Sequence, residues 1–231
     1  MKKDTGFSPP IAHFSTLRAL QRRLIEWYKK HGRDLPWRRT RDPYAILVSE
    51  IMLQQTQVSR VMVYYERFLE RYPTVEDLAS ADEGEVRESW EGLGYYRRAR
   101  NLQRASQEIV GKHKGRFPRT HEDLTALPGI GDYTAGAVRS FAFRHDAAIL
   151  DTNAARVLSR FFALSLEQQT DRFLWNVAHQ VTPTGQAYIF NQAIMDLGAT
   201  ICVARTPRCG VCPVRTICRR VKLKTEKIDS S

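Results

Sequence analysis

This 231-residue sequence has no cysteine outside one short segment and no long apolar run, and strand patterns are nearly absent from it. No cysteine occurs before Cys202, and all four lie between Cys202 and Cys218, so none is left for a role elsewhere. No apolar run approaches the roughly 20 residues of a membrane-spanning helix, and we expect no membrane association. Apolar residues recur at three- and four-residue spacing instead of alternating, which predicts an all-α fold.

Acidic residues are also few compared with basic ones. Lysine and arginine together number 36 against 25 aspartates and glutamates, which gives a formal net charge of +11. An excess of this size indicates a polyanionic partner, with nucleic acid as the first candidate. Residues 1–10 are polar and hold no signal-peptide core, so we expect a cytoplasmic, nucleoid-associated chain.

The four cysteines indicate a metal centre. Their spacing is C-x6-C-x2-C-x5-C, formed by Cys202, Cys209, Cys212 and Cys218. Thiolate is the soft ligand that both iron–sulfur clusters and zinc prefer. A structural zinc site usually pairs two Cys-x-x-Cys hooks, and only one is present here, so iron–sulfur is favoured over zinc. A disulfide pair is the remaining alternative.

Residues 127–135 (LPGIGDYTA) lie between two helical patterns and indicate a helix–hairpin–helix element. Gly129 and Gly131 permit a tight turn and let the backbone approach a ligand closely. The amides that lead into the following helix, with the positive end of its dipole, suit a phosphate oxygen. A single Gly-x-Gly is most often only a turn, but here Asp151 and the cysteine cluster follow it.

With these motifs the sequence resembles the helix-hairpin-helix DNA glycosylases that carry a C-terminal iron–sulfur cluster. Within that family it is most similar to the MutY-type adenine-DNA glycosylases, over about residues 33–218. Three further stretches carry the resemblance: residues 49–58 (SEIMLQQTQV), residues 92–102 (GLGYYRRARNL), and residues 191–193 (NQA) with 195–199 (MDLGA).

The resemblance implies an all-α fold of two helical lobes with a 4Fe-4S cluster held by the four cysteines. We expect a six-helix lobe with the hairpin at 36–143. Residues 11–35 and 144–218 would form a second lobe, which holds the cluster. Residues 1–10 and 219–231 would be flexible ends. The active site is expected in the cleft between the lobes.

Glu50 is the first catalytic candidate. Ile46, Leu47 and Leu53 lie one turn away on the same helix face, so a buried face would raise the carboxyl pKa and suit a proton donor. The alternative is an ordinary carboxylate on a helix edge. The resemblance implies that Glu50 protonates the adenine ring, which makes the base a better leaving group, and helps to activate water.

Asp151 is the second candidate, directly before a helix predicted at 152–164. The structural alternative for Asp151 is a helix N-cap, and both roles can coexist. The resemblance implies that its carboxylate faces the sugar as positive charge develops there, and that Asn153 helps to position it.

The resemblance implies that the residue type at position 133, here Tyr133, distinguishes two kinds of glycosylase. Relatives that also cut the DNA backbone carry a lysine here, which attacks the sugar as an amine. A phenol cannot form that Schiff base. We therefore predict a monofunctional enzyme that leaves an abasic site.

Further DNA-contacting residues come mainly from the matched motifs. The target base must be flipped out of the duplex, and Gln54, Gln55 and Tyr95 are candidates to fill the gap. A solvated helix face and ordinary packing are the alternatives for these side chains. Residues expected to line the base pocket are Arg33, Trp37 and Arg38, and those expected to reach phosphate from the cluster loop are Arg205 and Arg208.

The predicted partner is double-stranded DNA with a mismatched or damaged base, bound by a monomer. Adenine opposite 8-oxoguanine or guanine is the favoured target, because short relatives that remove thymine or uracil from T:G or U:G mismatches do not usually carry the run at Gln54–Gln57. Thr152 stands where adenine glycosylases usually have glycine.

Family members of this type also continue after the cluster with a domain that inspects 8-oxoguanine. The thirteen residues after Cys218 are too few and too charged to form one. A non-catalytic DNA-binding cluster protein, and a cluster-bearing redox or scaffold protein, are the alternatives from other classes.

Overall fold

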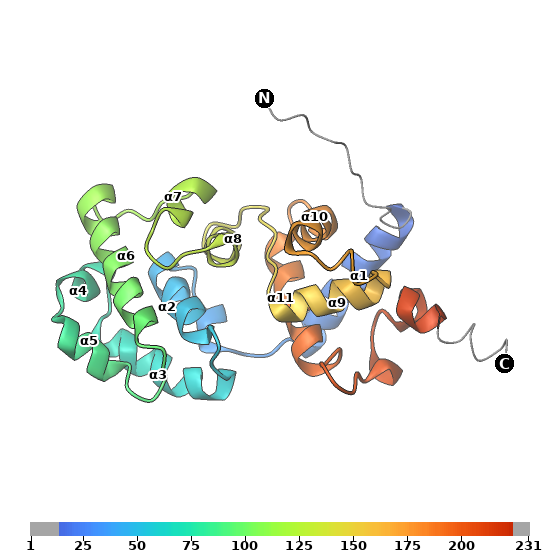
Figure 1. Cartoon of the computed structure of the whole chain (residues 1–231), viewed down its shortest axis with the longest axis horizontal. Helices are drawn as coiled ribbons and strands as arrows, with labels where there is room; N and C mark the ends of the chain where they lie inside the picture. The colour runs from blue at the N-terminus through green and yellow to red at the C-terminus, as the bar shows by residue number, and fades with distance from the viewer. Residues whose placement is uncertain (1–13, 224–231) are drawn as a thin grey trace, which may run out of the picture. The chain divides into compact units, whose positions relative to one another are not determined.

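The computed structural model describes residues 14–223, which divide into two compact units (Figure 1). We call residues 14–33 with 146–223 the terminal unit and residues 34–145 the central unit. Residues 14–223 contain helices and no β-strand, which confirms the all-α prediction. The flexible ends expected at 1–10 and 219–231 lie outside the described residues, except that 219–223 are described and form a helical turn.

The terminal unit is built from α1 (Phe14–His31), α9 (Thr152–Phe162), α10 (Asp171–Val181), α11 (Ala187–Thr200) and the 3-10 turns η2 (Cys209–Val211) and η3 (Arg215–Ile217). Helix α11 packs against both α1 and α9, as Figure 1 shows. The core of the terminal unit is apolar, and the following side chains in it are at most 2% exposed: Leu20, Leu24, Phe161, Phe190 and Leu197. This packing fixes α9, which begins after Asp151, against α11, which leads into the cysteine segment.

The central unit consists of η1 (Pro36–Arg38), α2 (Pro43–Leu53), α3 (Val58–Arg71), α4 (Val75–Ser80), α5 (Glu83–Ser89), α6 (Arg97–His113), α7 (His121–Thr125) and α8 (Asp132–Phe141). It has seven α-helices within the described residues, whereas we predicted six. The three short helices each start at their own N-cap side chain, namely Thr74, Asp82 and Thr120, so none merges with its neighbour.

Helix α2 forms the centre of this unit and packs against α3, α6 and α8. It starts where Asp42 accepts a hydrogen bond from the Tyr44 amide and Pro43 occupies the first turn, both of which favour a helix start. All but its first and last residues are buried. Such burial leaves little room for a charged side chain, which makes Glu50 exceptional.

No helix between residues 14 and 223 is both long and apolar enough to cross a membrane.

Candidate functional site

Glu50 lies in the last turn of α2 and is only 3% exposed. Ile46 and Leu47, one turn earlier, are 2% and 1% exposed, and Leu53 is partly exposed, so most of the apolar face predicted around Glu50 is buried. The structure therefore excludes the helix-edge alternative. Burying a carboxylate costs several kcal/mol unless its environment compensates, roughly 2–7 even for neutral polar groups. Its place in the most buried helix of the unit makes it a strong candidate for chemistry.

Tyr133 is the second residue of α8 and is half-buried. Because α8 packs against α2, Glu50 and Tyr133 come from two adjacent helices of the same unit.

The hairpin between α7 and α8 has the backbone that the two glycines predict. Gly129 has φ +78°, and a Cβ there would lie 2.7 Å from the Cβ of Asn101, so both conformation and space require glycine. Gly131 is the N-cap of α8 at φ −102°, and a Cβ there would meet no atom of the protein within 4 Å. The entrance to α8 is therefore open, as an approaching phosphate requires.

One carboxylate also stands at this entrance. Asp132, the first residue of α8, has its Oδ1 atom 2.9 Å from Nε2 of His121 at the start of α7. This pair joins the two helices of the hairpin and was not predicted from the sequence.

Asp151 is the N-cap of α9, with its two carboxylate oxygens held by different donors. Oδ1 accepts a hydrogen bond from the Ala154 amide at 2.6 Å, and Oδ2 accepts one from Nδ2 of Asn153 at 2.8 Å. The N-cap role is thus present, and so is the hydrogen bond expected of a residue that positions Asp151. Half-burial and two bonds fix the direction of this carboxylate.

Arg156, which the sequence analysis missed, continues this arrangement toward the cysteines. Its Nη2 atom donates to Oδ1 of Asn153 and to the carbonyl of Gly198, both at 2.8 Å. Its Nε atom donates to the carbonyl of Cys202 at 2.9 Å. A continuous set of hydrogen bonds therefore connects Asp151 to the first cysteine of the segment.

All four cysteines line one cavity of about 60 Å³ in the terminal unit. The remaining wall is mainly apolar, with side chains that include Val157, Phe161, Leu197 and Val214. No group of three or more His, Cys, Asp or Glu side chains within residues 14–223 is arranged to hold a single metal ion. Four soft ligands around one largely apolar cavity fit an iron–sulfur cluster.

Burial disfavours free thiolates in this cavity, while an arginine places positive charge at its wall. Burial raises the pKa of Cys212 to about 11, with the other cysteines adding to the effect, and burial also raises the pKa of Cys218. Such thiols become ligands only when a cation displaces their protons. Arg160 donates to Sγ of Cys202 at 3.6 Å, and to the carbonyls of Val203 and Ala204 at 2.7 and 2.6 Å, which places positive charge at the wall.

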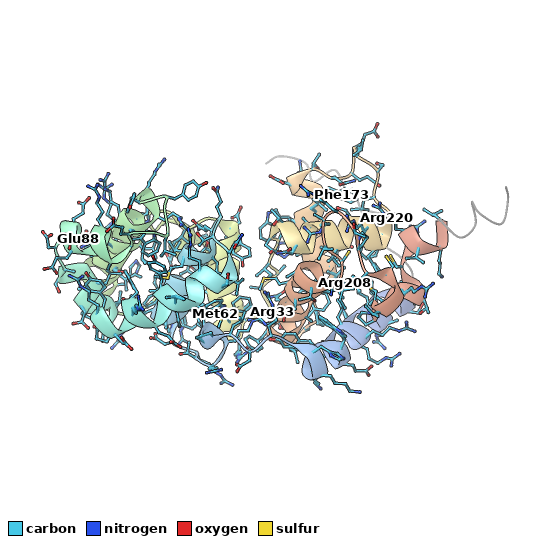
Figure 2. All side chains as sticks on the ribbon, turned by 90° about the horizontal axis from the view of Figure 1, so that it is seen from below. Arg33, Met62, Glu88, Phe173, Arg208 and Arg220 are labelled. Atoms are coloured by element: carbon cyan, nitrogen blue, oxygen red, sulfur yellow. The ribbon has the colours of Figure 1, made fainter. Side chains whose placement is uncertain are left out.

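The remaining basic candidates fall into two groups. Arg205 and Arg208 are exposed on the loop that joins Cys202 to Cys209, and Figure 2 shows Arg208 and Arg220 on this C-terminal part. Arg33 instead clamps a buried carboxylate: its amide and Nε atoms donate to Asp196 at 2.9 and 2.7 Å. Asp196 is 0% exposed, so this pair joins the end of α1 to α11.

Trp37 and Arg38 sit in η1 of the central unit. The Trp37 ring is 7% exposed and packs edge-to-face on Tyr65 with 5.5 Å between ring centroids, which is a core contact. Arg38 is half-exposed. Their assignment to a base pocket stays a prediction, as does the convergence of Glu50 and Asp151, which belong to different units.

The two predicted gap-filling loops share one property. Gln55 after α2 and Tyr95 before α6 are both exposed and both have positive φ, at 55° and 49°. The sequence did not reveal which residue contacts both loops. The structure identifies it as Arg98, a buried arginine.

Comparison with known proteins identifies the family signatures in this chain. Residues 48–180 match the HhH-GPD superfamily base excision DNA repair proteins. Residues 202–218 match the iron–sulfur binding domain of endonuclease III. The second match covers the four cysteines, so the cavity that they line is a 4Fe-4S site, as predicted.

Individual relatives agree with the resemblance drawn from the sequence. Adenine DNA glycosylase of Rattus norvegicus is 44% identical over 213 residues, covering 87% of this chain but only 41% of its own length. Thymine-DNA glycosylase of Aeropyrum pernix is 42% identical over 209 residues, covering 87% of this chain and 94% of its own length. A solved structure of a thermostable thymine-DNA glycosylase superposes with a TM-score of 0.85 at 32% identity, covering 90% of this chain and 98% of that one. The chain thus spans about two fifths of the mammalian relative and nearly all of the archaeal one.

Proposed function

The chain belongs to the HhH-GPD superfamily of base excision DNA repair proteins, and from that premise we propose that it is a monofunctional DNA glycosylase that removes mispaired adenine from double-stranded DNA. The burial of Glu50 on α2 carries the proposal. Likeness to the adenine DNA glycosylase of Rattus norvegicus supports adenine as the base.

The proposed reaction is hydrolysis of the N-glycosidic bond of a flipped-out nucleotide. Glu50 donates a proton to the adenine ring, the bond between the base and C1′ of the sugar breaks, and adenine leaves as a neutral molecule. The cationic sugar is stabilised by the carboxylate of Asp151, whose direction Asn153 and the Ala154 amide fix. Water then adds to C1′ while Glu50 takes its proton, which completes an abasic site. The 4Fe-4S cluster takes no part in these proton transfers; its cysteines hold the loop that carries Arg205 and Arg208.

Tyr133 supports the monofunctional part of the proposal. A phenol on α8 offers no amine to attack C1′, so the product keeps an intact backbone.

DNA contacts follow from charge and exposed backbone. The open entrance to α8 and the exposed Arg205 and Arg208 would bind phosphates, consistent with the net charge of +11. Gln54, Gln55 and Tyr95 would occupy the space left by the extruded base. We infer a monomer that acts on DNA at the nucleoid, in the cytoplasm.

Thymine or uracil opposite guanine is the second candidate substrate. It is favoured by the Aeropyrum pernix thymine-DNA glycosylase, of which the chain covers 94%, and by the similar solved structure. Thr152, next to Asp151, also departs from the adenine type.

A panel of duplexes with A, T or U opposite guanine or 8-oxoguanine tests these proposals. The purified protein is incubated with each duplex, and abasic sites are revealed by alkali cleavage, with Glu50→Gln as the matched inactive control. Excision of adenine supports the proposal. Excision of T or U alone selects the second candidate, and excision of no base by a protein that still binds the duplexes selects a non-catalytic DNA-binding protein.

A further inference from the structure

Arg98 is a buried cation that no carboxylate neutralises within the described part of the chain. It is the second residue of α6 and is 9% exposed. Burial lowers its pKa, because the charged form loses hydration. All of its side-chain hydrogen bonds go to oxygen atoms of the last turn of α2, of the loop that follows α2 and of the loop before α6. Helices α2 and α6 lie beside each other in the central unit, as Figure 1 shows.

The first group of partners lies in the last turn of α2, the helix that carries Glu50, and in the loop after it. Nη1 of Arg98 donates to the carbonyls of Ile51 and Met52 at 2.9 Å each, and also to the carbonyl of Gln54. Carbonyls in the last turn of a helix have no partner within the helix and carry the negative end of its dipole, so a guanidinium is well suited to them. Nη2 donates to Oγ1 of Thr56 at 3.0 Å. Gln55, with φ 55°, lies between these bonded residues.

The second loop carries Tyr95. Nη2 of Arg98 donates to the carbonyls of Leu93 and Gly94 at 3.2 Å each, and the Arg98 amide donates to the carbonyl of Tyr95 at 2.8 Å. The guanidinium lies 5.4 Å from the centroid of the Tyr95 ring and 5.7 Å from that of Trp90. Tyr95 is 60% exposed and Trp90 is 0% exposed. The exposed ring is thus supported by a fixed cation–π contact.

Both loops hold a non-glycine residue in the left-handed conformation, which is unfavourable for such residues unless their surroundings stabilise it. The Arg98 side chain is bonded to the residues on both sides of Gln55 and to the residue before Tyr95, and its main-chain amide is bonded to Tyr95 itself. One residue therefore contacts both loops at their positive-φ positions. Lysine could not replace it, because one ammonium lacks the planar fork that reaches both loops.

We propose that Arg98 is a positioning residue that holds Gln55 and Tyr95 as one preformed wedge for the gap left by the extruded nucleotide. This inference rests on the proposed function and deepens it. Because the two loops are already fixed, they need not become ordered when the base leaves the stack. Less of the binding energy is therefore lost to conformational entropy at that step. Arg98 itself is buried and acts only through the two loops.

Base extrusion measured by the fluorescence of 2-aminopurine at the target position tests the proposal, together with single-turnover excision and the affinity for a fully paired duplex. Arg98→Lys should reduce extrusion and excision by about tenfold or more, while affinity for the paired duplex changes by less than about threefold. Arg97→Lys, an exposed neighbour that keeps its charge, is the matched control and should behave like the wild type. Thermal melting confirms that measurements are made on folded protein.

A double-mutant cycle with Tyr95→Ala separates positioning from general stability. Because Arg98 acts through both Tyr95 and Gln55, the loss in the double variant should be smaller than the sum of the two single losses in free energy. Additive losses would overturn the proposal, because independent sites add. Should Arg98→Lys fail to fold, Thr56→Val removes one bond alone and should lower extrusion in the same direction; unchanged extrusion in Thr56→Val would count against the inference.

The outcomes distinguish this inference from the proposed function. Excision by the wild type with equal extrusion by Arg98→Lys overturns the role of Arg98 and leaves the glycosylase intact. A wild-type protein that neither extrudes nor excises a base overturns both.

Discussion

Arg156 bonds to Oδ1 of Asn153 at 2.8 Å with one end of its guanidinium, and to the carbonyl of Cys202 at 2.9 Å with its Nε atom. Asn153 in turn donates to Asp151, the carboxylate proposed to stabilise the cationic sugar. The cysteine segment is therefore mechanically connected to the direction of this carboxylate. Disturbance at either end should be detectable at the other.

Asn153→Ala tests the near end of this connection. Asp151 would keep the hydrogen bond from the Ala154 amide, so the start of α9 should survive, but Oδ2 would lose its donor. We expect the single-turnover excision rate to fall about 10–100-fold, as for a misplaced catalytic group. Affinity for the duplex and the melting temperature should change little, and an unchanged rate would show that Asn153 does not position Asp151.

Glu50→Gln tests the proton donor. Glutamine has the same shape and can occupy the buried site on α2, but it cannot protonate a leaving base. Loss of general acid catalysis should lower the excision rate by about 10²–10⁴-fold, with duplex affinity retained. The measurement is single-turnover excision beside a gel-shift titration. Near-normal excision would remove Glu50 from the mechanism.

Tyr133→Lys tests the assignment of a monofunctional enzyme. An amine at this position of α8 could attack C1′ and form a Schiff base, so strand nicking without alkali and a borohydride-trapped adduct should both appear. Tyr133→Phe is the control and should show neither. An active lysine variant without nicking or adduct would count against a role for Tyr133 at the sugar.

Local sequence predicted the parts of this molecule that depend on local chemistry. The helical spacing of Ile46 and Leu47 predicted an apolar face around Glu50, which the structure buries, and the spacing of the cysteines predicted a cluster that the family comparison confirms. Gly129 likewise required its turn, since φ +78° excludes most other residues.

Long-range partners could not be predicted in this way. Arg98 stands in a stretch rich in arginine and tyrosine, where an exposed phosphate-binding residue is the natural expectation. In the structure it is buried instead, and it donates to carbonyls more than 40 positions earlier in the chain. One of these is the carbonyl of Ile51, 47 residues away. The clamp between Arg33 and Asp196 joins residues 163 positions apart. The sequence does not reveal the partners of Arg98, because every residue has a main-chain carbonyl. It does not reveal the partner of Arg33 either, because any of many arginines could pair with a single aspartate.

Cys202→Ser tests the role of the cluster. The variant should lose bound iron and the brown colour of the protein, because serine is a poor ligand for an iron–sulfur cluster. The loop with Arg205 and Arg208 would lose its anchor, so duplex affinity should fall by about tenfold or more. Iron analysis and a gel-shift titration measure the two effects, and an iron-free variant with full affinity would refute this role.

Gly198→Ala and Gly111→Ala form a pair that tests the contact between α9 and α11. A Cβ at position 198 would lie 2.6 Å from the Cβ of Asn153 and 3.0 Å from its carbonyl oxygen, neither of which can swing away. We expect a loss of about 1–3 kcal/mol in the free energy of unfolding, as for overpacked cores.

Gly111 is exposed within α6, and a Cβ there would meet nothing within 4 Å, so alanine should stabilise by about 0.5–1 kcal/mol through helix propensity. Because the first substitution also displaces Asn153, it should reduce excision as well as stability, whereas Gly111→Ala should leave excision unchanged. Thermal denaturation followed by circular dichroism, beside single-turnover excision, measures both; equal stability of the two variants would contradict the close helix contact.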